Sequence, residues 1–426
     1  MTRDSTPAAE VPRSPVGRAL DEMTASFERF CLAAGLEVLG EMLEADAAVL
    51  CGPRHGRGGG RQAQRWGRTA GPIGFHGGKV SVVRPRVRER GGGKEVVLPS
   101  WERAVGEDWL GRWALNLMLI GVTTRRFGRA VRLPEGDVPA GPGAGVSKSA
   151  ASRRFVALSA ERMAAWMAQD LSGLDLLAVQ IDGLHITEEL VLVAAVGIDA
   201  EGAKHPLGLV EGATENAAVA QALLDDLVGR GLDPATCRLF IVDGAKALTK
   251  AIRRTFGRDT PIQRCQVHKA RNIADRLPKA LQAPVRRALR QAWELDDAAK
   301  AERLLRNLAR TLEPRAPGAA AAILEGLDEI LTVVRLGLPR EPRRSLACTN
   351  VIENVLGSVR RVCRNVKRWR DAGMALRWTA AAMLEAAKGF RRLKAKRHLP
   401  ALRAALTAHR AKARANAPIA QQPRAA

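Results

Sequence analysis

The chain has 426 residues, and its 68 lysines and arginines outnumber its 44 aspartates and glutamates to give a formal net charge of +24. This length predicts two or more domains with ample core, and the charge predicts a polyanionic partner, nucleic acid before any other. No membrane partner is expected, because the longest apolar run, residues 190–198, is too short to cross a bilayer and residues 1–20 lack the apolar segment of a secretory signal.

The six cysteines are scattered along the chain and include no Cys-x-x-Cys pair. This distribution favours a reducing compartment over a disulfide framework. We therefore expect a cytoplasmic protein.

Residues 1–70 are predicted to comprise an N-terminal helix and a basic loop. Apolar residues recur at helical spacing between Leu20 and Leu50. Residues 51–70 are rich in glycine and arginine and have no periodicity, which fits either a loop that touches phosphates or a plain solvated loop.

A β-hairpin is predicted over residues 71–100. Residues 79–88 alternate between apolar and polar or basic side chains, and a second short strand at residues 95–98 follows a glycine turn. Every second residue from Arg84 to Arg90 is an arginine, so one face of the ribbon would be basic and would meet either DNA or solvent.

Residues 101–170 are predicted to be helical and to contain a helix-turn-helix, a motif with which proteins read DNA. A first helix at residues 122–131, a Pro/Gly-rich break and a second helix from Val146 to Met163 would form it. The second helix would present short polar side chains and three basic ones that suit base edges and phosphates, Lys148, Arg153 and Arg154. An ordinary pair of helices explains the same pattern.

From residue 174 the pattern changes to that of a mixed α/β sheet, and residues 171–267 are predicted to form its main part. Three apolar segments would be adjacent strands, followed by a helix, a strand ending at Asp243, a second helix and a last strand at residues 262–267. In a sheet of order 3-2-1-4, the first and fourth strands would be neighbours.

The rest of the chain is predicted to be mostly helical. Residues 268–345 are charged and rich in alanine, leucine and arginine, which indicates an all-α insertion broken at prolines. Residues 346–395 supply two further helices, and residues 396–426 form a basic tail that we expect to be frayed.

Two carboxylates are conspicuous because each lies in or at the end of an apolar strand. Asp182 interrupts the run LLAVQIDGLHI, and Asp243 closes LFIVD. A buried carboxylate is costly unless it is paired or binds a metal, and on neighbouring strands the two could share divalent cations. Each also has a simpler explanation, since Asp182–Gly183 is a hairpin-turn signal and Asp243 could cap the following helix.

Glu353 is the third candidate carboxylate. Asn350 and Glu353 have the spacing of a capping box, which is its simpler explanation. The same segment supplies basic candidates for binding DNA beside an acidic metal centre: Arg360, Arg361, Arg364, Lys367 and Arg368. Arg360, Arg364 and Lys367 would share one helical stripe with Glu353.

Cys265 and His268 form a Cys-x-x-His pair that could offer two zinc ligands. Zinc takes four ligands and no second pair stands nearby, so we expect His268 to be a polar group near phosphates or a hydrogen-bonded core residue. Trp293 and Trp369 are candidates for stacking an unpaired base, with ordinary packing as the alternative for each.

Four motifs, taken in order, resemble the Mutator-type bacterial insertion-sequence transposases: QIDGLHI, FIVDGAKAL, QRCQVHKARNI and TNVIENVLGSVRRVCRNVKRW. The resemblance implies a ribonuclease H-like catalytic core, a mixed five-stranded sheet with helices that is interrupted by an all-α insertion and preceded by a mainly helical DNA-binding region. It also implies an Asp-Asp-Glu triad of catalytic and metal-binding residues, Asp182, Asp243 and Glu353, with Cys265 and His268 as a motif near the site.

The resemblance further implies binding of terminal inverted repeats and target DNA, and strand cleavage and transfer with Mg²⁺ or Mn²⁺. The protein would act in a prokaryotic cytoplasm at the nucleoid, as a homodimer or higher homo-oligomer. Residues 51–98 depart from the family, since they lack tyrosine where its members carry a Tyr/Arg-rich stretch. Two alternatives stay open: a catalytically silent DNA-binding repressor or scaffold of the same fold, and a structure-specific nuclease.

Overall fold

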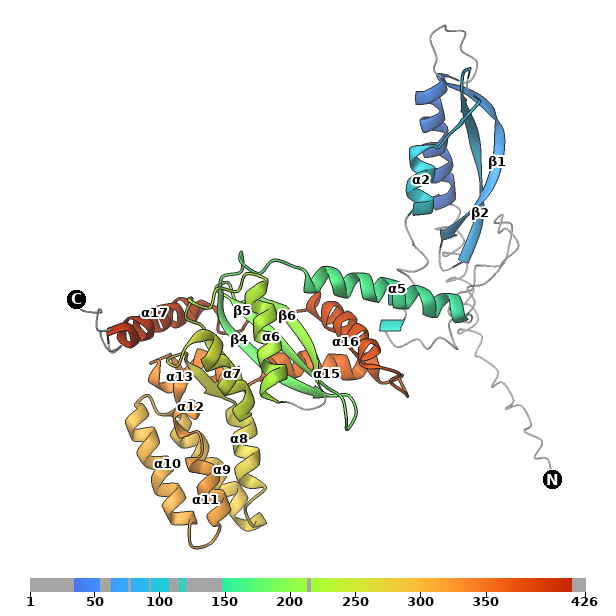
Figure 1. Cartoon of the computed structure of the whole chain (residues 1–426). Helices are drawn as coiled ribbons and strands as arrows, with labels where there is room; N and C mark the ends of the chain where they lie inside the picture. The colour runs from blue at the N-terminus through green and yellow to red at the C-terminus, as the bar shows by residue number, and fades with distance from the viewer. Residues whose placement is uncertain are drawn as a thin grey trace, which may run out of the picture. The chain divides into compact units, whose positions relative to one another are not determined.

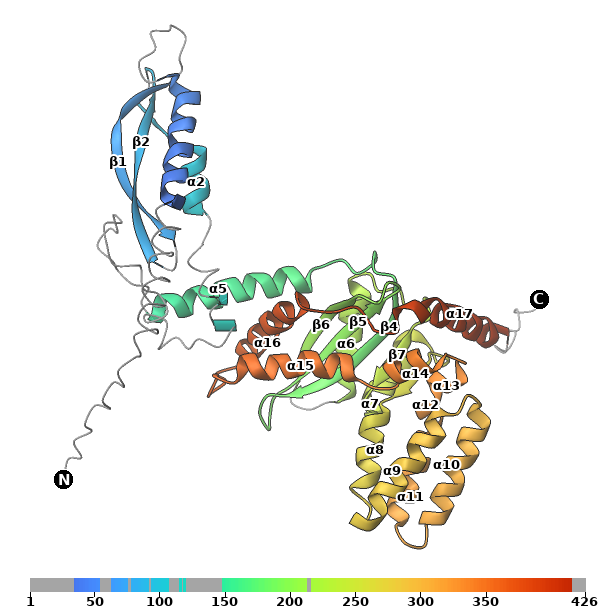
Figure 2. The ribbon, with the colours of Figure 1, turned by 180° about the vertical axis from the view of Figure 1, so that it is seen from behind.

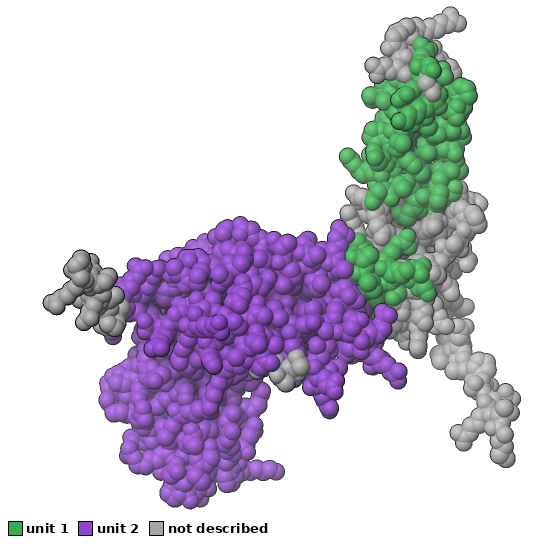
Figure 3. Space-filling model, viewed as in Figure 1, with its two compact units in different colours: residues 1–158 green, residues 159–426 purple. Residues whose placement is uncertain are grey.

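The computed structural model comprises two compact units, residues 1–158 and residues 159–426, which are coloured separately in Figure 3. The described residues are 34–53, 63–75, 78–91, 93–106, 115–116, 118–119, 148–212 and 216–415. The first helix of the expected helix-turn-helix, residues 122–131, lies outside these ranges. None of the helices within them combines the length and the apolar character that a bilayer span requires.

The first unit is built on a three-stranded antiparallel sheet of order β1-β2-β3. Leu43 and Ala47 of the helix at residues 34–51 are buried with Val87 and Leu98 in the core of this unit. The expected hairpin is confirmed, because β2 pairs with β3 across the glycine turn. The strands and the second helix of the unit are β1 (Ala63–Phe75), β2 (Gly78–Glu89), β3 (Glu95–Val96) and α2 (Pro99–Gly106).

The basic loop expected over residues 51–70 is wrong from residue 63 onward, where β1 forms and pairs along its length with β2. Trp101 of α2 packs directly on this strand, since a Cβ added to Gly71 would lie 2.6 Å from the Trp101 ring. β1 contains small residues, so the alternation of apolar and polar side chains that marks a strand is not visible in its sequence. The Trp101 ring provides an apolar packing surface for these small residues.

The second unit is organised around a five-stranded mixed sheet of order β6-β5-β4-β7-β8 (Figures 1 and 2). β4 pairs antiparallel with β5 and parallel with β7, so the expected contact between the first and fourth strands is confirmed. The five strands are β4 (Leu176–His185), β5 (Val191–Asp199), β6 (Lys204–Gly212), β7 (Leu239–Val242) and β8 (Ile262–Arg264).

Helices cover both faces of this sheet, which is why its central strands are apolar throughout rather than alternating. α6 (Ala217–Gly229) and α7 (Lys246–Phe256) pack on one face in a core that includes Val179 and Ile181 of β4. α15 (Asn350–Cys363) and α16 (Ala372–Ala387) lie behind the sheet in Figure 1 and in front of it in Figure 2. Since successive residues of a strand point to opposite faces, the next side chains along β4 point toward α15.

Residues 266–346 are helical and have a hydrophobic core of their own. Buried Gln263 fixes this helical segment to the sheet edge, because its amide donates to the Ile330 carbonyl and accepts from the Val333 amide. The helices are α8 (Gln266–Ala274), α9 (Lys279–Glu294), α10 (Ala298–Leu312), α11 (Pro317–Leu324), α12 (Leu327–Ile330), α13 (Thr332–Arg335) and α14 (Arg340–Leu346).

The frayed tail expected from residue 396 is wrong as far as Ala415. A short 3₁₀ turn, η1 (Lys396–His398), leads into helix α17 (Leu399–Ala415). Its leucines at 399, 402 and 406 are buried, and Arg403 forms an ion pair with Asp175 beside the start of β4. The alanine- and arginine-rich sequence resembles a low-complexity tail, but three leucines at helical spacing give it an apolar face.

We predict that Leu402→Ala lowers the free energy of unfolding of the second unit by about 2–5 kcal/mol, because Leu402 is fully buried and its loss leaves a cavity. Leu324→Ala is the matched control, since Leu324 of α11 is 43% exposed, and should cost less than about 1 kcal/mol. Urea unfolding followed by circular dichroism measures both. Equal effects of the two substitutions would show that α17 is not docked.

Candidate carboxylate site

Asp182 and Asp243 are brought side by side by the parallel pairing of β4 with β7. Ile181 is in register with Val242, and the two aspartates are the next residues in the chain, Asp182 within β4 and Asp243 directly after β7. The hairpin-turn explanation for Asp182 is wrong, because Asp182 lies inside β4 opposite Ala194. The helix-cap explanation for Asp243 is also wrong, since the N-cap of α7 is Ala245. Asp243 Oδ1 does accept a hydrogen bond from the Ala245 amide at 2.9 Å.

Gln180 ties the start of α15 to the strand that carries Asp182. It is fully buried, its Nε2 donates to the Cys348 carbonyl at 3.1 Å, and its Oε1 accepts from the Ile352 amide at 3.0 Å. Gln180 and Asp182 share a face of β4, since they are two residues apart. The side chain therefore fixes Glu353, the next residue after Ile352, on the side of the sheet toward which Asp182 points.

Glu353 is oriented by Thr349 and not by a capping box with Asn350, which is therefore wrong. Thr349 is the N-cap of α15, and its side chain caps no backbone amide. Its buried hydroxyl donates instead to Glu353 Oε1 at 2.6 Å and lies 3.3 Å from Cys265 Sγ. The hydrogen bond thus holds the Glu353 carboxylate in one orientation, and the carboxylate does not cap the backbone amides at the start of α15.

Cys265 and His268 lie beside this carboxylate. The Cys265 amide donates to the Val242 carbonyl, one residue before Asp243, and so places α8 at the site. One ligand atom each from Cys265, His268 and Glu353 lies within 4.8 Å of the other two. Within the described residues this group has three members, one fewer than a structural zinc site uses. His268 is half-buried next to charged groups, which agrees with a polar role near the site more than with a core residue.

Electrostatic coupling joins the cluster. Burial, then the neighbouring charge of Asp243, raises the pKa of Asp182 to about 7, and Glu353 and His268 also act on it. His268 Nδ1 is 3.8 Å from Glu353 Oε1, and the hydrogen bond with Cys265 raises the pKa of His268 to about 9. No lysine or arginine of the described ranges forms an ion pair with either aspartate.

These features fit a hard divalent cation. Two half-buried neighbouring aspartates that form no ion pair with a described lysine or arginine are a donor set of oxygens that a positive ion would stabilise. Sequence reasoning missed Gln180 and Thr349, which set the geometry. The signal for Gln180 was present, because a glutamine inside the apolar run LLAVQI needs buried hydrogen-bond partners.

The basic residues after Glu353 are exposed but do not form one helical stripe. α15 ends at Cys363, so Lys367 lies in the connection to α16 and its predicted place on the stripe is wrong. Arg360 and Arg364 keep their helical spacing from Glu353. The exposed basic side chains of this segment are Arg360, Arg361, Arg364, Lys367 and Arg368, and Trp369 after them is half-buried.

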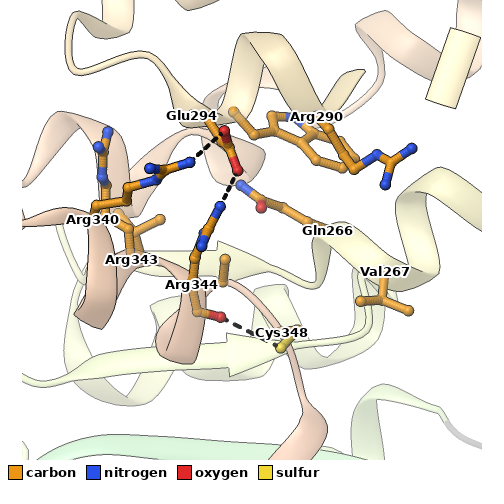
Figure 4. Close-up of a pocket in the computed structure, with 11 residues that line it drawn as sticks. Gln266, Val267, Arg290, Glu294, Arg340, Arg343, Arg344 and Cys348 are labelled. Carbon is orange, nitrogen blue, oxygen red and sulfur yellow. Dashed lines mark hydrogen bonds and ion pairs between the residues drawn. The ribbon is translucent and has the colours of Figure 1, made fainter. Parts of the chain in front are cut away.

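Trp293 of α9 is half-buried, packs against the core of the helical segment, and lines a cavity of about 180 Å³. In Figure 4, Arg340 and Arg344 are directed toward Glu294, with which both form ion pairs, whereas Arg290 points away from it. The buried indole Nε1 has no hydrogen-bond partner among the residues that the structure describes. The predicted stacking role and the packing role are therefore both compatible with its position.

The N-terminal candidates for binding DNA lie on α5 and on β2. α5 (Lys148–Met167) carries an exposed Arg153 and a half-buried Arg154. The arginines of β2 are engaged within the first unit: Arg84 lies over the Trp101 ring, Arg88 lies over Trp66, and Arg86 pairs with Glu95 at 2.8 Å.

Known proteins resemble this chain over most of its length. A family model described as Transposase, Mutator family, matches residues 22–392. The transposase for insertion sequence element IS6120 of Mycolicibacterium smegmatis is 31% identical over 243 residues, 55% of this chain and 73% of that protein. The transposase for insertion sequence element IST2 of Acidithiobacillus ferrooxidans is 33% identical over 171 residues, 40% of this chain and 56% of that protein. The transposase for insertion sequence element IS256 in transposon Tn4001 of Staphylococcus aureus is 26% identical over 338 residues, 76% of this chain and 81% of that protein.

We predict that Gln180→Leu loosens the first turn of α15. The substitution leaves the Cys348 carbonyl and the Ile352 amide buried without partners, at a cost of about 1–3 kcal/mol each. Hydrogen exchange at the Ile352 and Glu353 amides should accelerate more than exchange at the helices of residues 266–346. Gln263→Leu, which removes the other buried glutamine, should give the reverse pattern. Uniform acceleration in both variants would refute a local role for Gln180.

We also predict that Asp182→Asn stabilises the protein above pH 7 when divalent ions are chelated. The raised pKa means that the folded wild type loses stability as the pH rises from about 4, the unfolded value, through about 7. Asparagine cannot ionise, so the melting temperature of the variant at pH 8 should exceed that of the wild type by roughly 5 °C. The difference should shrink toward zero at pH 4.5, and a constant difference would contradict the assignment.

Proposed function

The chain belongs to the Mutator family of transposases, and on that premise we propose that it is the transposase of an insertion sequence that cleaves and joins DNA with an Asp-Asp-Glu triad. The observation that supports this proposal is that Asp182 and Asp243 follow paired positions of β4 and β7 and that the charges of Asp243 and Glu353 both act on Asp182. Carboxylates at this spacing in the chain meet only through the tertiary fold, and no simpler structural role explains all three.

We propose that the five-stranded sheet is a ribonuclease H-like core. Three antiparallel strands followed by two parallel ones, with the first strand at the centre, support this assignment. The helical residues 266–346 would then be an insertion between β8 and the helix that carries Glu353. This insertion would explain why Glu353 lies so far along the sequence from Asp243.

Asp182, Asp243 and Glu353 would hold Mg²⁺ or Mn²⁺, whose preferred ligands are carboxylate oxygens. When bound, such ions activate the attacking oxygen and stabilise the leaving oxygen of a phosphoryl transfer. Thr349 would fix the rotamer of Glu353 through its 2.6 Å hydrogen bond, and Gln180 would keep α15 at its distance from β4. The raised pKa of Asp182 follows first from its burial, and a positive charge nearby would favour its ionised form at neutral pH.

The reaction would proceed in two steps at this one site. Water opens the phosphodiester at the element's end and leaves a 3′-hydroxyl. That hydroxyl then attacks a phosphodiester of the target DNA, a new phosphodiester forms, and the 3′-oxygen of the target strand leaves. His268, which is protonated at neutral pH, would provide a positive charge beside Glu353 and the phosphate.

We propose that the basic residues of the two units share the DNA-binding work. Arg360, Arg361, Arg364, Lys367 and Arg368 would contact the backbone beside the carboxylates, and Lys148, Arg153 and Arg154 would belong to the region that binds terminal inverted repeats. Trp293 or Trp369 would stack on an unpaired base. Recognition of two element ends would require a homodimer or a larger assembly.

We predict that Asp182→Asn, Asp243→Asn and Glu353→Gln each lower cleavage of repeat-ended DNA at least 10³-fold with Mg²⁺, a loss of about 4 kcal/mol of transition-state stabilisation. Binding of the same DNA, measured by fluorescence anisotropy, should stay within about threefold of wild type, because these residues hold ions and not sequence.

The same assay separates the alternatives. A repressor or scaffold would bind the repeat and not cleave it even as wild type. A structure-specific nuclease would cut branched DNA without a repeat sequence. Normal cleavage and joining by any one of the three variants would remove that residue from the triad. Glu385→Gln, a change of a half-buried glutamate on α16, serves as the control for charge loss.

A further inference from the structure

A second basic cavity lies beside the carboxylate site and is not explained by it. The cavity has a volume of about 740 Å³ and lies between α7, the ends of β7 and β8, and residues 325–329. We call it the α7 cleft. Gly244 and Arg264 line it, and each is next in sequence to a site residue, Asp243 and Cys265. The cleft and the carboxylate site are therefore formed by adjacent residues at the ends of β7 and β8.

Close packing shapes the inner wall of the cleft. Gly244 has a φ of +110°, and a Cβ at this position would lie 2.0 Å from Arg264 Nε. The Arg264 guanidinium thus lies flat against the backbone that follows Asp243. Arg264 Nη2 is 3.6 Å from Glu325 Oε2, so the wall is fixed from both sides. A rigid wall of this kind suits a site that positions a ligand.

Cations outnumber carboxylates in the cleft by six to two. Glu329 is matched by Arg253 at 3.0 Å. Glu325 is shared by Lys246, Arg264 and buried Lys269, each at 3.6–3.8 Å. The excess positive charge in the cleft is therefore not neutralised by its own acidic residues.

Three side chains form the free edge of the cleft: Lys250, Arg254 and Arg258. All three are exposed, and none forms an ion pair with any residue of the described ranges. Among the described residues that line the cleft, Thr249 is the only uncharged polar side chain, so the lining is dominated by cations, whose commonest partners on DNA are phosphates. Contacts here would be made by charge to a backbone.

The length of the cleft fits a short stretch of nucleic acid. α7 has 11 residues, which correspond to about 16 Å of helix. A DNA strand rises about 3.4 Å per nucleotide, so α7 spans about five nucleotides. Its basic residues recur at spacings of three and four, which places them along one side of the helix.

We propose that the α7 cleft binds the phosphodiester backbone of duplex DNA irrespective of sequence, and that it holds the DNA that runs from the carboxylate site without carrying the terminal repeat. The identity of that DNA rests on the proposed function. The backbone contact itself rests on the charge excess and on the free edge of the cleft.

The test compares the triple variant Lys250→Ala, Arg254→Ala, Arg258→Ala with the wild-type full-length chain. Binding of a repeat-free duplex of about 30 base pairs is measured by fluorescence anisotropy over a salt series, with divalent ions chelated. Each phosphate contact contributes about 0.9 to the slope of log affinity against log salt. We expect the slope to decrease in magnitude by 2 to 3, and the affinity at low salt to fall more than tenfold.

The matched control is Arg287→Ala, Arg303→Ala, Arg310→Ala, which removes the same charge from exposed positions on α9 and α10. Its slope should change by less than about 1. Single substitutions at Lys250, Arg254 and Arg258 repeat the test if the triple variant does not fold, and their slope changes should add. Equal slopes for the α7 and control variants, or a loss of affinity without a change of slope, would overturn the proposal.

A second arm identifies the DNA. Duplex that ends in the terminal repeat should lose less affinity than repeat-free duplex, because other residues bind the repeat. An equal or greater loss would overturn the assignment to DNA outside the repeat. Since binding is measured without divalent ions, a chain that never cleaves DNA would still give this result, and the cleavage variants test the triad separately.

Discussion

One buried glutamine sets the geometry on which the second unit depends. Gln180 sits in the middle of an apolar strand and satisfies two backbone groups at the start of α15. A polar side chain in such a place is costly unless its partners are in position, so the strand and the helix stabilise each other only in one register. That register determines the distance between Asp182 and Glu353. Gln263 has the corresponding role on the edge strand β8, where its hydrogen bonds hold the helices of residues 266–346.

The charges of this protein are divided between two environments. The carboxylates of the candidate site are half-buried and lie close to one another, which raises the pKa of Asp182. The exposed cations of the second unit lie outside this site, on α7, after α15, along α17 and on the helices of residues 266–346. A polyanion that binds the basic surface would therefore be attracted by the cations and repelled by the carboxylates. Positive ions bound between the carboxylates and the polyanion would remove that repulsion.

Cys265 and Thr349 link the two ends of the helical segment to the site. Cys265 precedes α8 and Thr349 precedes α15, and their side chains meet 3.3 Å apart. The Gln266 amide also donates to the Ala347 carbonyl at 2.9 Å. A helical segment whose two ends are held together in this way leaves the sheet and returns to it without displacing Glu353. The candidate site thus tolerates a long separation in sequence because the ends of the segment are adjacent in space.

The sequence by itself determined the elements of the sheet and selected the candidate carboxylates. Apolar runs are local signals, and a carboxylate in a buried run is conspicuous without a structure. The tertiary structure alone decided which simpler roles were wrong: Asp182 is no hairpin turn, and Glu353 bonds Thr349 instead of a helix amide. It also decided that β1 is a strand and α17 a docked helix. Both segments depend on contacts between residues far apart in the sequence, because Trp101 packs on β1 and the leucines of α17 are buried against the rest of the second unit. A local sequence pattern does not show whether such contacts exist.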